Sequence, residues 1–142
     1  MSSVPLIVLA EDNAPDVFLV RTALEEVGLD FQLQVFPDGE QVLKFLADVE
    51  KGETPGPDVL LLDLNMPRSG GHEVLERFRK TPRGASTSVI VITSSDSARD
   101  KELAASLGVD HFFRKPADLD EFMKLGTLVR QVLEPWSSPN RP

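Results

Sequence analysis

Short apolar runs recur along the chain, and each is bounded by turn-forming or charged residues. Five of them are rich in branched or aromatic residues, as β-strands are: 4–10, 31–36, 59–62, 89–92 and 109–113. The runs at 59–62 and 89–92 are apolar at every position, which is typical of strands covered on both faces in a parallel sheet. The pattern therefore predicts five strands, at least two of them buried on both sides.

Between these runs, apolar residues repeat every three or four positions, which predicts amphipathic helices. The first three stripes are formed by Val17, Val20, Leu24 and Val27, by Val42, Leu43, Phe45 and Leu46, and by Val74, Leu75 and Phe78. A fourth helix is predicted at about 98–107, and a fifth from about Asp118 to Glu134, where Pro135 follows. Five alternations of strand and helix with right-handed crossovers give a doubly wound α/β fold, with helices on both faces of the sheet.

The length of 142 residues suits a single domain. We expect its core at about 4–134, followed by a short tail at 135–142, and we find no internal repeat and no linker. A Gly- and Pro-rich segment at 51–57 is predicted to be a loop before the third strand. We therefore expect one domain, 1–142, with no output domain attached, so that its function is exerted by docking.

Acidic residues outnumber basic ones, with 23 Asp and Glu against 15 Lys and Arg, and the formal net charge is -8. Such a surface repels phosphate backbones and anionic lipid headgroups, so we expect neither nucleic acid nor a membrane as a partner. The chain has no cysteine, which excludes disulfides, thiolate nucleophiles and zinc–cysteine sites. Its first residues show neither a signal peptide nor a membrane span, and we expect a cytoplasmic protein.

Polar residues follow four of the predicted strands, at the end where doubly wound folds bind ligands. Glu11 and Asp12 follow the first strand, Asp63 the third, Thr93 the fourth and Lys115 the fifth. If the strand order is 2-1-3-4-5, the first and third strands flank the switch point and their carboxylates converge. Each residue alone could be an ordinary solvated side chain, but like charges about 4 Å apart repel by roughly 4 kcal/mol at an effective dielectric of about 20. The cluster should take up a proton or hold a cation, and its oxygen ligands favour Mg²⁺.

The same residues resemble the motifs of the receiver domains of two-component response regulators. The motifs are Glu11-Asp12-Asn13, Asp63-Leu-Asn-Met-Pro67, Thr93-Ser94 and Lys115-Pro116, and the resemblance extends from about Leu6 to Glu134. The intervals from Asp63 to Thr93 and from Thr93 to Lys115 are normal for that family. The resemblance implies a flavodoxin-like (βα)5 fold with a five-stranded parallel sheet of order 2-1-3-4-5.

The resemblance implies that Asp63 is the phosphoacceptor, whose carboxylate attacks the phosphohistidine of a sensor histidine kinase. Mg²⁺ would bind directly to Asp12, Asp63 and the main-chain carbonyl of Asn65, with Glu11 holding a metal-bound water. Phosphoryl transfer depends mostly on positioning and on neutralising oxygen charge, which fits this set of residues. The protein would then be a phosphoacceptor rather than an enzyme, apart from self-catalysed transfer and dephosphorylation.

The resemblance also implies which residues respond to the phosphoryl group. Lys115 would supply positive charge, with a cis Lys115–Pro116 bond aiming its ammonium into the pocket. The hydroxyl of Thr93 would donate to a phosphoryl oxygen, and such a bond contributes about 1.5–3 kcal/mol, enough to shift a two-state equilibrium. Phe112 takes the position of the aromatic switch residue that moves inward with the threonine, where the family often has tyrosine.

Within the family, three features are similar to small stand-alone regulators paired with phytochrome-type histidine kinases. They are Asp16 after Glu11-Asp12-Asn13, the Pro-rich loop before Pro57-Asp58, and Asp63-Leu-Asn-Met-Pro67. A bacterial phytochrome is therefore the candidate sensor kinase, and light signalling is the candidate pathway.

Three other functions remain open. A flavodoxin-like electron carrier shares the topology, but Glu11 and Asp12 would repel a flavin phosphate. A magnesium-dependent aspartyl phosphohydrolase would need an acid two residues after Asp63, where the chain has Asn65. A receiver-like docking module that is never phosphorylated is disfavoured because the motifs of the phosphorylation site are intact.

The predicted fifth helix is apolar over a wide arc. Leu119, Phe122, Val129 and Leu133 form one stripe, and Leu125, Leu128, Val132 and Trp136 form a second beside it. Together with Met123 they cover roughly 220°, whereas a helix that packs on one core needs a little over about 100°. Unless neighbouring loops cover it, we expect the second stripe, with Leu125, Leu128 and Val132, to form a homodimer interface.

Overall fold

Five parallel strands form one sheet in the computed structural model, which describes residues 4–68, 70–94 and 96–137. The strands are β1 (Leu6–Ala10), β2 (Gln32–Phe36), β3 (Val59–Leu62), β4 (Ser88–Thr93) and β5 (His111–Arg114). Their order is β2-β1-β3-β4-β5, and all neighbouring strands are parallel. The predicted strands and their order are confirmed, and the strand ends differ from the prediction by at most two residues.

The three central strands carry the most apolar sequence. All residues from Ile7 to Ala10, from Val59 to Leu62 and from Val89 to Thr93 are buried, whereas the edge strands β2 and β5 are only partly buried. Because the removal of apolar surface from water stabilises a fold, these three strands occupy the centre of the sheet. The expectation that 59–62 and 89–92 are covered on both faces is confirmed.

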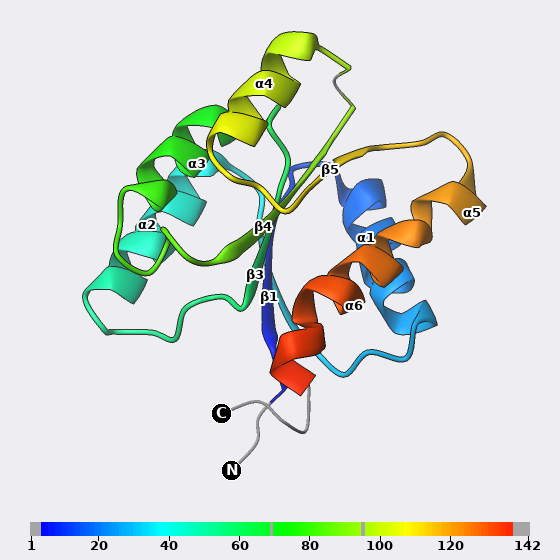
Figure 1. Ribbon diagram of the computed structural model, residues 1–142, viewed down its shortest axis with the longest axis horizontal. Helices are drawn as coiled ribbons and strands as arrows, with labels where there is room; N and C mark the ends of the chain where they lie inside the picture. Colours follow the sequence, from blue (N-terminus) through cyan, green and yellow to red (C-terminus); the bar gives the residue numbers. More distant parts are fainter. Residues whose placement is uncertain (1–3, 69, 95, 138–142) are drawn as a thin grey trace.

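Helices cover both faces of the sheet in the described part of the chain (Figure 1). They are α1 (Ala14–Glu26), α2 (Gly39–Glu50), α3 (Gly71–Arg79), α4 (Ala98–Ser106), α5 (Leu119–Phe122) and α6 (Lys124–Ser137). α1, α5 and α6 lie on one face, and α2, α3 and α4 lie on the other. Among residues 4–68, 70–94 and 96–137, no helix combines the length and the apolar character that a bilayer crossing requires.

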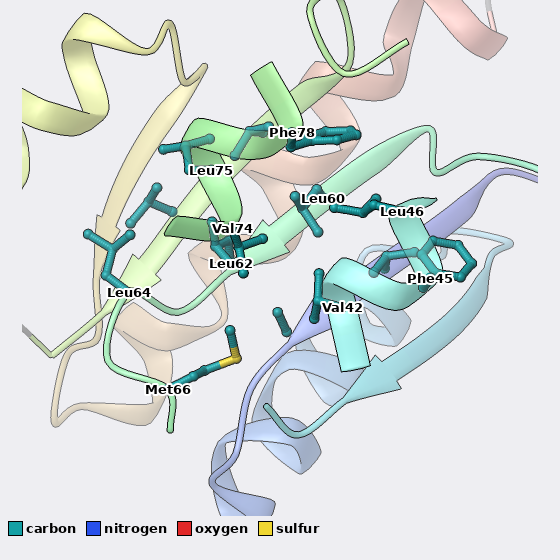
Figure 2. Close-up of a cluster of buried hydrophobic side chains, with 14 of the residues drawn as sticks. Val42, Phe45, Leu46, Leu60, Leu62, Leu64, Met66, Val74, Leu75 and Phe78 are labelled. Carbon is teal, nitrogen blue, oxygen red and sulfur yellow. The ribbon is translucent and has the colours of Figure 1, made fainter. Parts of the chain in front are cut away.

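Each layer of helices encloses its own apolar cluster. Figure 2 shows the cluster under α2 and α3, where Phe45 and Phe78 pack around Leu60 of β3. On the other face, Leu61 of β3 belongs to the cluster under α1 and α6, which includes Leu125. Successive strand residues therefore alternate between the two clusters, as the geometry of a strand requires.

The start of α3 lies directly against the residue that follows β3. Gly71 N–H donates to Leu64 O at 3.1 Å, and a Cβ atom on Gly71 would lie 2.4 Å from Asp63 O. Only glycine fits so close to this main chain, because any other residue carries a Cβ atom. The packing of α3 thus contributes to the position of Asp63.

The predicted fifth helix is divided into α5 and α6 at Met123. Gly126 N–H donates to Met123 O at 3.1 Å, a tight bond over three residues at the junction. A Cβ atom on Gly126 would lie 2.2 Å from Ala23 O of α1, so glycine at this position allows α6 to pack closely against α1. The predicted end at Glu134 is also wrong, because α6 continues to Ser137; Pro135 lies in its last turn and does not end it.

The burial of α6 contradicts part of the predicted homodimer interface. Leu125 is fully buried in the cluster between α1, α6 and the sheet, so it contributes nothing to an exposed stripe. Leu128 and Val132 are partly buried and pack against the same cluster. The side chain of Trp136 lies outside the described residues. The part of the apolar arc that lies on α6 is explained because α6 packs against both the sheet and α1, whereas Leu119 of α5 is exposed.

Candidate functional site

Main-chain hydrogen bonds continue past the carboxyl ends of the strands and hold the predicted site residues side by side. Glu11 N–H donates to the last residue of β2 at 3.0 Å, Asp63 N–H to the last residue of β1 at 3.0 Å, and Lys115 N–H to the last residue of β4 at 2.8 Å. The polar residues that follow three different strands are thereby fixed by the sheet itself. Their convergence, predicted for the order 2-1-3-4-5, is confirmed.

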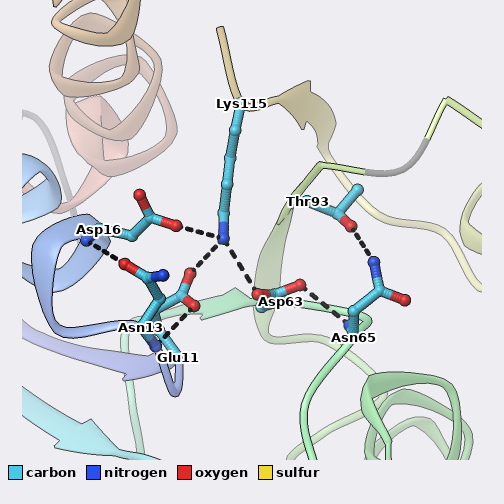
Figure 3. Close-up of polar contacts among 7 residues, drawn as sticks. All are labelled: Glu11, Asn13, Asp16, Asp63, Asn65, Thr93 and Lys115. Carbon is cyan, nitrogen blue, oxygen red and sulfur yellow. Dashed lines mark hydrogen bonds and ion pairs between the residues drawn. The ribbon is translucent and has the colours of Figure 1, made fainter. Parts of the chain in front are cut away.

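The Lys115 ammonium lies among three carboxylates (Figure 3). Its Nζ is 2.7 Å from Glu11 Oε1, 2.8 Å from Asp16 Oδ2 and 3.0 Å from Asp63 Oδ2. The exposed fraction of the side chain is 9% for Lys115, 0% for Glu11 and 6% for Asp63, but 23% for Asp16. An ammonium has three N–H donors, so one is available for each carboxylate. Lys115 is therefore the counter-ion of a largely buried acidic site.

Glu11, Asp12 and Asp63 form one acidic cluster, as predicted. Each offers a carboxylate oxygen, and these oxygens lie within 4.8 Å of one another. Glu11 and Asp63 are buried, whereas Asp12 is exposed, so the cluster opens to solvent at Asp12. Carboxylate oxygens are the donors that hard divalent cations prefer. The cluster could therefore hold a divalent metal ion.

Burial changes the proton affinity of two of these groups. Burial raises the pKa of Glu11 to about 7, although the hydrogen bond from Lys115 opposes the rise. Burial lowers the pKa of the Lys115 ammonium, but its hydrogen bonds to Asp16 and Glu11 outweigh this effect and hold that pKa above its usual value. At neutral pH, Lys115 is therefore charged, while Glu11 exchanges a proton readily. Proton uptake is one of the two ways in which we expected the crowded carboxylates to be relieved.

Asn65 connects the carboxylate of Asp63 with the hydroxyl of Thr93. Asn65 N–H donates to Asp63 Oδ1 at 2.9 Å, and its side-chain Nδ2 donates to Thr93 Oγ1 at 3.0 Å. Thr93 is fully buried at the end of β4. A change at the Asp63 carboxylate can therefore reach Thr93 through a single residue.

Residues 7–126 match the family model of the response regulator receiver domain. The chain belongs to this family. It is 32% identical to the probable methanogenesis regulatory protein FilR2 of Methanothrix harundinacea, over 96% of this chain and 86% of the relative. It is 31% identical to the response regulator Rcp1 of Synechocystis sp., over 84% of this chain and 82% of the relative.

Solved structures of related response regulators share the fold of this receiver domain. The Mn(2+)-bound form of Rcp1 superposes with a TM-score of 0.80 at 30% identity, over 89% of this chain and 92% of Rcp1. The phosphorylated cyanobacterial phytochrome response regulator RcpA also gives a TM-score of 0.80, at 28% identity, over 96% of both chains. The flavodoxin-like fold expected from the sequence is confirmed.

One expectation for the receiver domain is wrong. The described residues contain no cis peptide bond, so the bond between Lys115 and Pro116 is trans. Lys115 nevertheless reaches the acidic residues, because its main chain extends the pairing between β5 and β4 and its side chain is long enough to cross to Asp63. Phe112 lies in β5, half-buried against the apolar cluster under α2 and α3, and its role as a switch stays a prediction.

Two contacts in the receiver domain go beyond the sequence prediction. Asp16 binds Lys115, although the sequence indicated it only as part of a family motif. The side chain of Asn65 binds Thr93, whereas only the main-chain carbonyl of Asn65 was assigned a role. The available sequence signal for Asp16 is its place in the first turn of the helix that follows Glu11 and Asp12.

Proposed function

We propose that this receiver domain accepts a phosphoryl group on Asp63 from a sensor histidine kinase and then changes the surface that it offers to partners. The observation that carries the proposal is the setting of Asp63. Its Oδ2 lies 3.0 Å from the Lys115 ammonium, and its Oδ1 accepts the Asn65 N–H at 2.9 Å. The carboxylate is held in a defined orientation beside a buried positive charge.

The transfer breaks the P–N bond of the kinase phosphohistidine and forms a P–O bond to Asp63. The carboxylate oxygen of Asp63 supplies the electron pair, and the histidine nitrogen keeps the pair of the broken bond. Because phosphoryl oxygens are negatively charged, the Lys115 ammonium favours both the approach and the product. The Thr93 hydroxyl would bind a phosphoryl oxygen, which moves Thr93 and, in our proposal, Phe112.

We propose Mg²⁺ as the cation of the site, which Asp12, Asp63 and the main-chain carbonyl of Asn65 would hold directly and Glu11 through a water. When bound, a divalent cation supplies positive charge that neutralises carboxylate and phosphoryl oxygens. The all-oxygen donor set supports a hard cation. The Mn(2+)-bound form of Rcp1 gives independent support for a divalent cation in a related protein.

We further propose that the kinase is a bacterial phytochrome and that the pathway responds to light. The support is the similarity to RcpA, which is described as a phytochrome response regulator and matches 96% of both chains. In this proposal the chain is a cytoplasmic signalling module, one receiver domain, rather than an enzyme with a separate substrate. The absence of cysteine from its sequence fits a reducing compartment.

We propose a homodimer interface that is smaller than the one predicted from the sequence. Leu128 and Val132 are partly exposed on α6, whereas Leu125 is fully buried, so only the first two can contribute to a contact between copies. Replacing both Leu128 and Val132 with Glu should give a folded monomer. Wild-type protein that sediments as a monomer at tens of micromolar would contradict the homodimer.

The test of the proposed function is the intact mass of the protein after incubation with acetyl phosphate. In the presence of Mg²⁺, wild-type protein should gain one phosphoryl group. A chelator should abolish the gain, because the crowded carboxylates must be neutralised before a phosphate can approach. Asp63→Asn should gain nothing, since it replaces the attacking carboxylate with an amide.

Asp48→Asn is the matched control, because Asp48 is an acid on α2, away from the site, that forms an ion pair with Lys44 one turn earlier in the same helix. This variant should be phosphorylated like the wild type. Label retained by Asp63→Asn would contradict the assignment of the phosphoacceptor. Label acquired without a divalent cation would contradict the metal requirement.

A further inference from the structure

Asp16 differs from the other two carboxylates that contact Lys115. Glu11 and Asp63 belong to the acidic cluster that could hold a metal ion, and Asp16 does not. Glu11 and Asp63 follow strands of the sheet, whereas Asp16 comes from the first turn of α1. A cation at the acidic cluster therefore competes with Lys115 for two of its three partners. The contact with Asp16, at 2.8 Å, is the one that stays available.

The main chain of α1 holds Asp16 in place. Its N–H donates at 2.9 Å to the side chain of Asn13, which caps the helix. Pro15, directly before Asp16, restricts the backbone of the same turn, and a carboxylate in the first turn interacts favourably with the helix dipole. The position of Asp16 is therefore fixed by α1, and the Lys115 ammonium donates a hydrogen bond to its carboxylate (Figure 3).

We propose that Asp16 is a positioning residue for phosphoryl transfer: it holds the Lys115 ammonium beside Asp63 while a cation and a phosphoryl group occupy the acidic cluster. This inference rests on the proposed function. Without Asp16, the ammonium has only Glu11 and Asp63 as partners and competes more strongly with an incoming cation. A partly exposed ion pair adds little to folding stability, so the effect of this contact is on the location of the ammonium.

A double-mutant cycle read out by Mg²⁺ binding tests this role in unphosphorylated protein. Asp16→Asn keeps the shape of the side chain and removes its charge, and we expect the affinity for Mg²⁺ to fall by about three- to tenfold, which is within the range of coupling between residues in contact. In a Lys115→Met background, the same substitution should change the affinity by less than about twofold. No ammonium is left there to compete with the cation.

Two control variants separate this role from a general loss of charge. Glu40→Gln removes an exposed acid from the first turn of α2 and should leave the affinity for Mg²⁺ unchanged. Asp16→Glu keeps a carboxylate at this position, and its affinity for Mg²⁺ should stay within about twofold of the wild-type value. The initial rate of phosphorylation by acetyl phosphate should follow the same order among these variants.

An equal fall in affinity with and without Lys115 would show that Asp16 acts only through its charge at a distance, and it would overturn the proposal. No fall in the wild-type background would overturn it as well. If wild-type protein is phosphorylated on Asp63 and the cycle shows no coupling, only the role of Asp16 fails. If wild-type protein takes no phosphoryl group on Asp63, the proposed function fails, whatever the Mg²⁺ affinities are.

Discussion

Two cationic side chains hold opposite ends of the sheet, and their partners differ in kind. At the carboxyl end, Lys115 contacts three carboxylates. At the amino end, Arg79 donates to four main-chain carbonyls: Leu107 O, Gly84 O and Thr87 O at 2.7 Å each, and Gly108 O at 2.9 Å. Arg79 thus connects the end of α3 with the segments that lead into β4 and β5.

The difference lies in what can compete for the partners. A main-chain carbonyl does not titrate, so protons do not compete with Arg79 for its four partners in the pH range where carboxylates ionise. Carboxylates bind protons, metal ions and phosphoryl groups, so the contacts of Lys115 can be replaced one at a time. We therefore call the amino end of the sheet, at Arg79, the permanent end, and the carboxyl end, at Lys115, the exchangeable end.

The largest effect is expected at the permanent end. Arg79→Ala removes hydrogen bonds from four carbonyls and should lower the free energy of unfolding by about 2–4 kcal/mol, since bonds to a charged donor are strong and their loss leaves acceptors unpaired. Urea unfolding measures this loss. Arg77→Ala is the control, because Arg77 is exposed and forms an ion pair with Glu73 across one turn; its loss should cost less than about 0.5 kcal/mol. Equal losses for the two variants would refute the structural role of Arg79.

A smaller effect, dependent on pH, is expected at the exchangeable end. The pKa of Glu11 is raised from 4.5 to about 7 in the folded protein, so the folded state favours the neutral carboxyl. The corresponding stability is fully present below pH 4.5 and is lost as the pH rises through about 7, by up to about 3 kcal/mol. Glu11→Gln is neutral throughout and should lack this loss in metal-free protein. Parallel stability curves from pH 5 to pH 8, as expected if Glu11 does not titrate in this range, would contradict the raised pKa.

The smallest effect is expected on the coupling from Asp63 to Thr93. Thr93→Val keeps the volume but removes the hydroxyl that accepts the Asn65 side chain. The variant should still accept a phosphoryl group. Once phosphorylated, it should favour the switched conformation about ten- to a hundredfold less than the phosphorylated wild type, because one hydrogen bond to a charged group is worth about 1.5–3 kcal/mol. Amide NMR spectra of β5, around Phe112, report the response.

Thr22→Val is the matched control for this experiment, since the Thr22 hydroxyl donates within α1, to Phe18 O at 2.9 Å, away from the site. It should respond to phosphorylation like the wild type. A full response in phosphorylated Thr93→Val would show that the signal does not pass through the hydroxyl.

The strands and the acidic cluster could be predicted because both depend on local patterns. The apolar run at 59–62 is β3 itself, with the same bounds. Glu11 and Asp63 each come directly after such a run, and parallel strands end at the same edge of a sheet. The strand order 2-1-3-4-5 then brings Lys115 to the same place from β5. Once the apolar runs and the polar residues that follow them are known, few other arrangements of these site residues are possible.

The other contacts depend on where distant segments meet, and no local pattern encodes this. Arg79 reaches carbonyls as far as 29 residues away in the sequence, and neither glycine nor leucine carbonyls leave a sequence signal. Leu125 was expected on an exposed stripe because one neighbour was assumed for its helix. In the structure α6 packs against two neighbours, the sheet and α1, and Leu125 lies between them.

The most direct test of the proposed exchange at the carboxyl end of the sheet is to identify the residue that carries the phosphoryl group. Wild-type protein is phosphorylated with acetyl phosphate and Mg²⁺, the acyl phosphate is trapped by reduction with borohydride, and the modified residue is identified by peptide mass spectrometry. We predict modification at Asp63 alone, the carboxylate held between Lys115 and Asn65. Modification at Glu11 or Asp12, with Asp63 unmodified, would contradict the assignment of Asp63 as the phosphoacceptor.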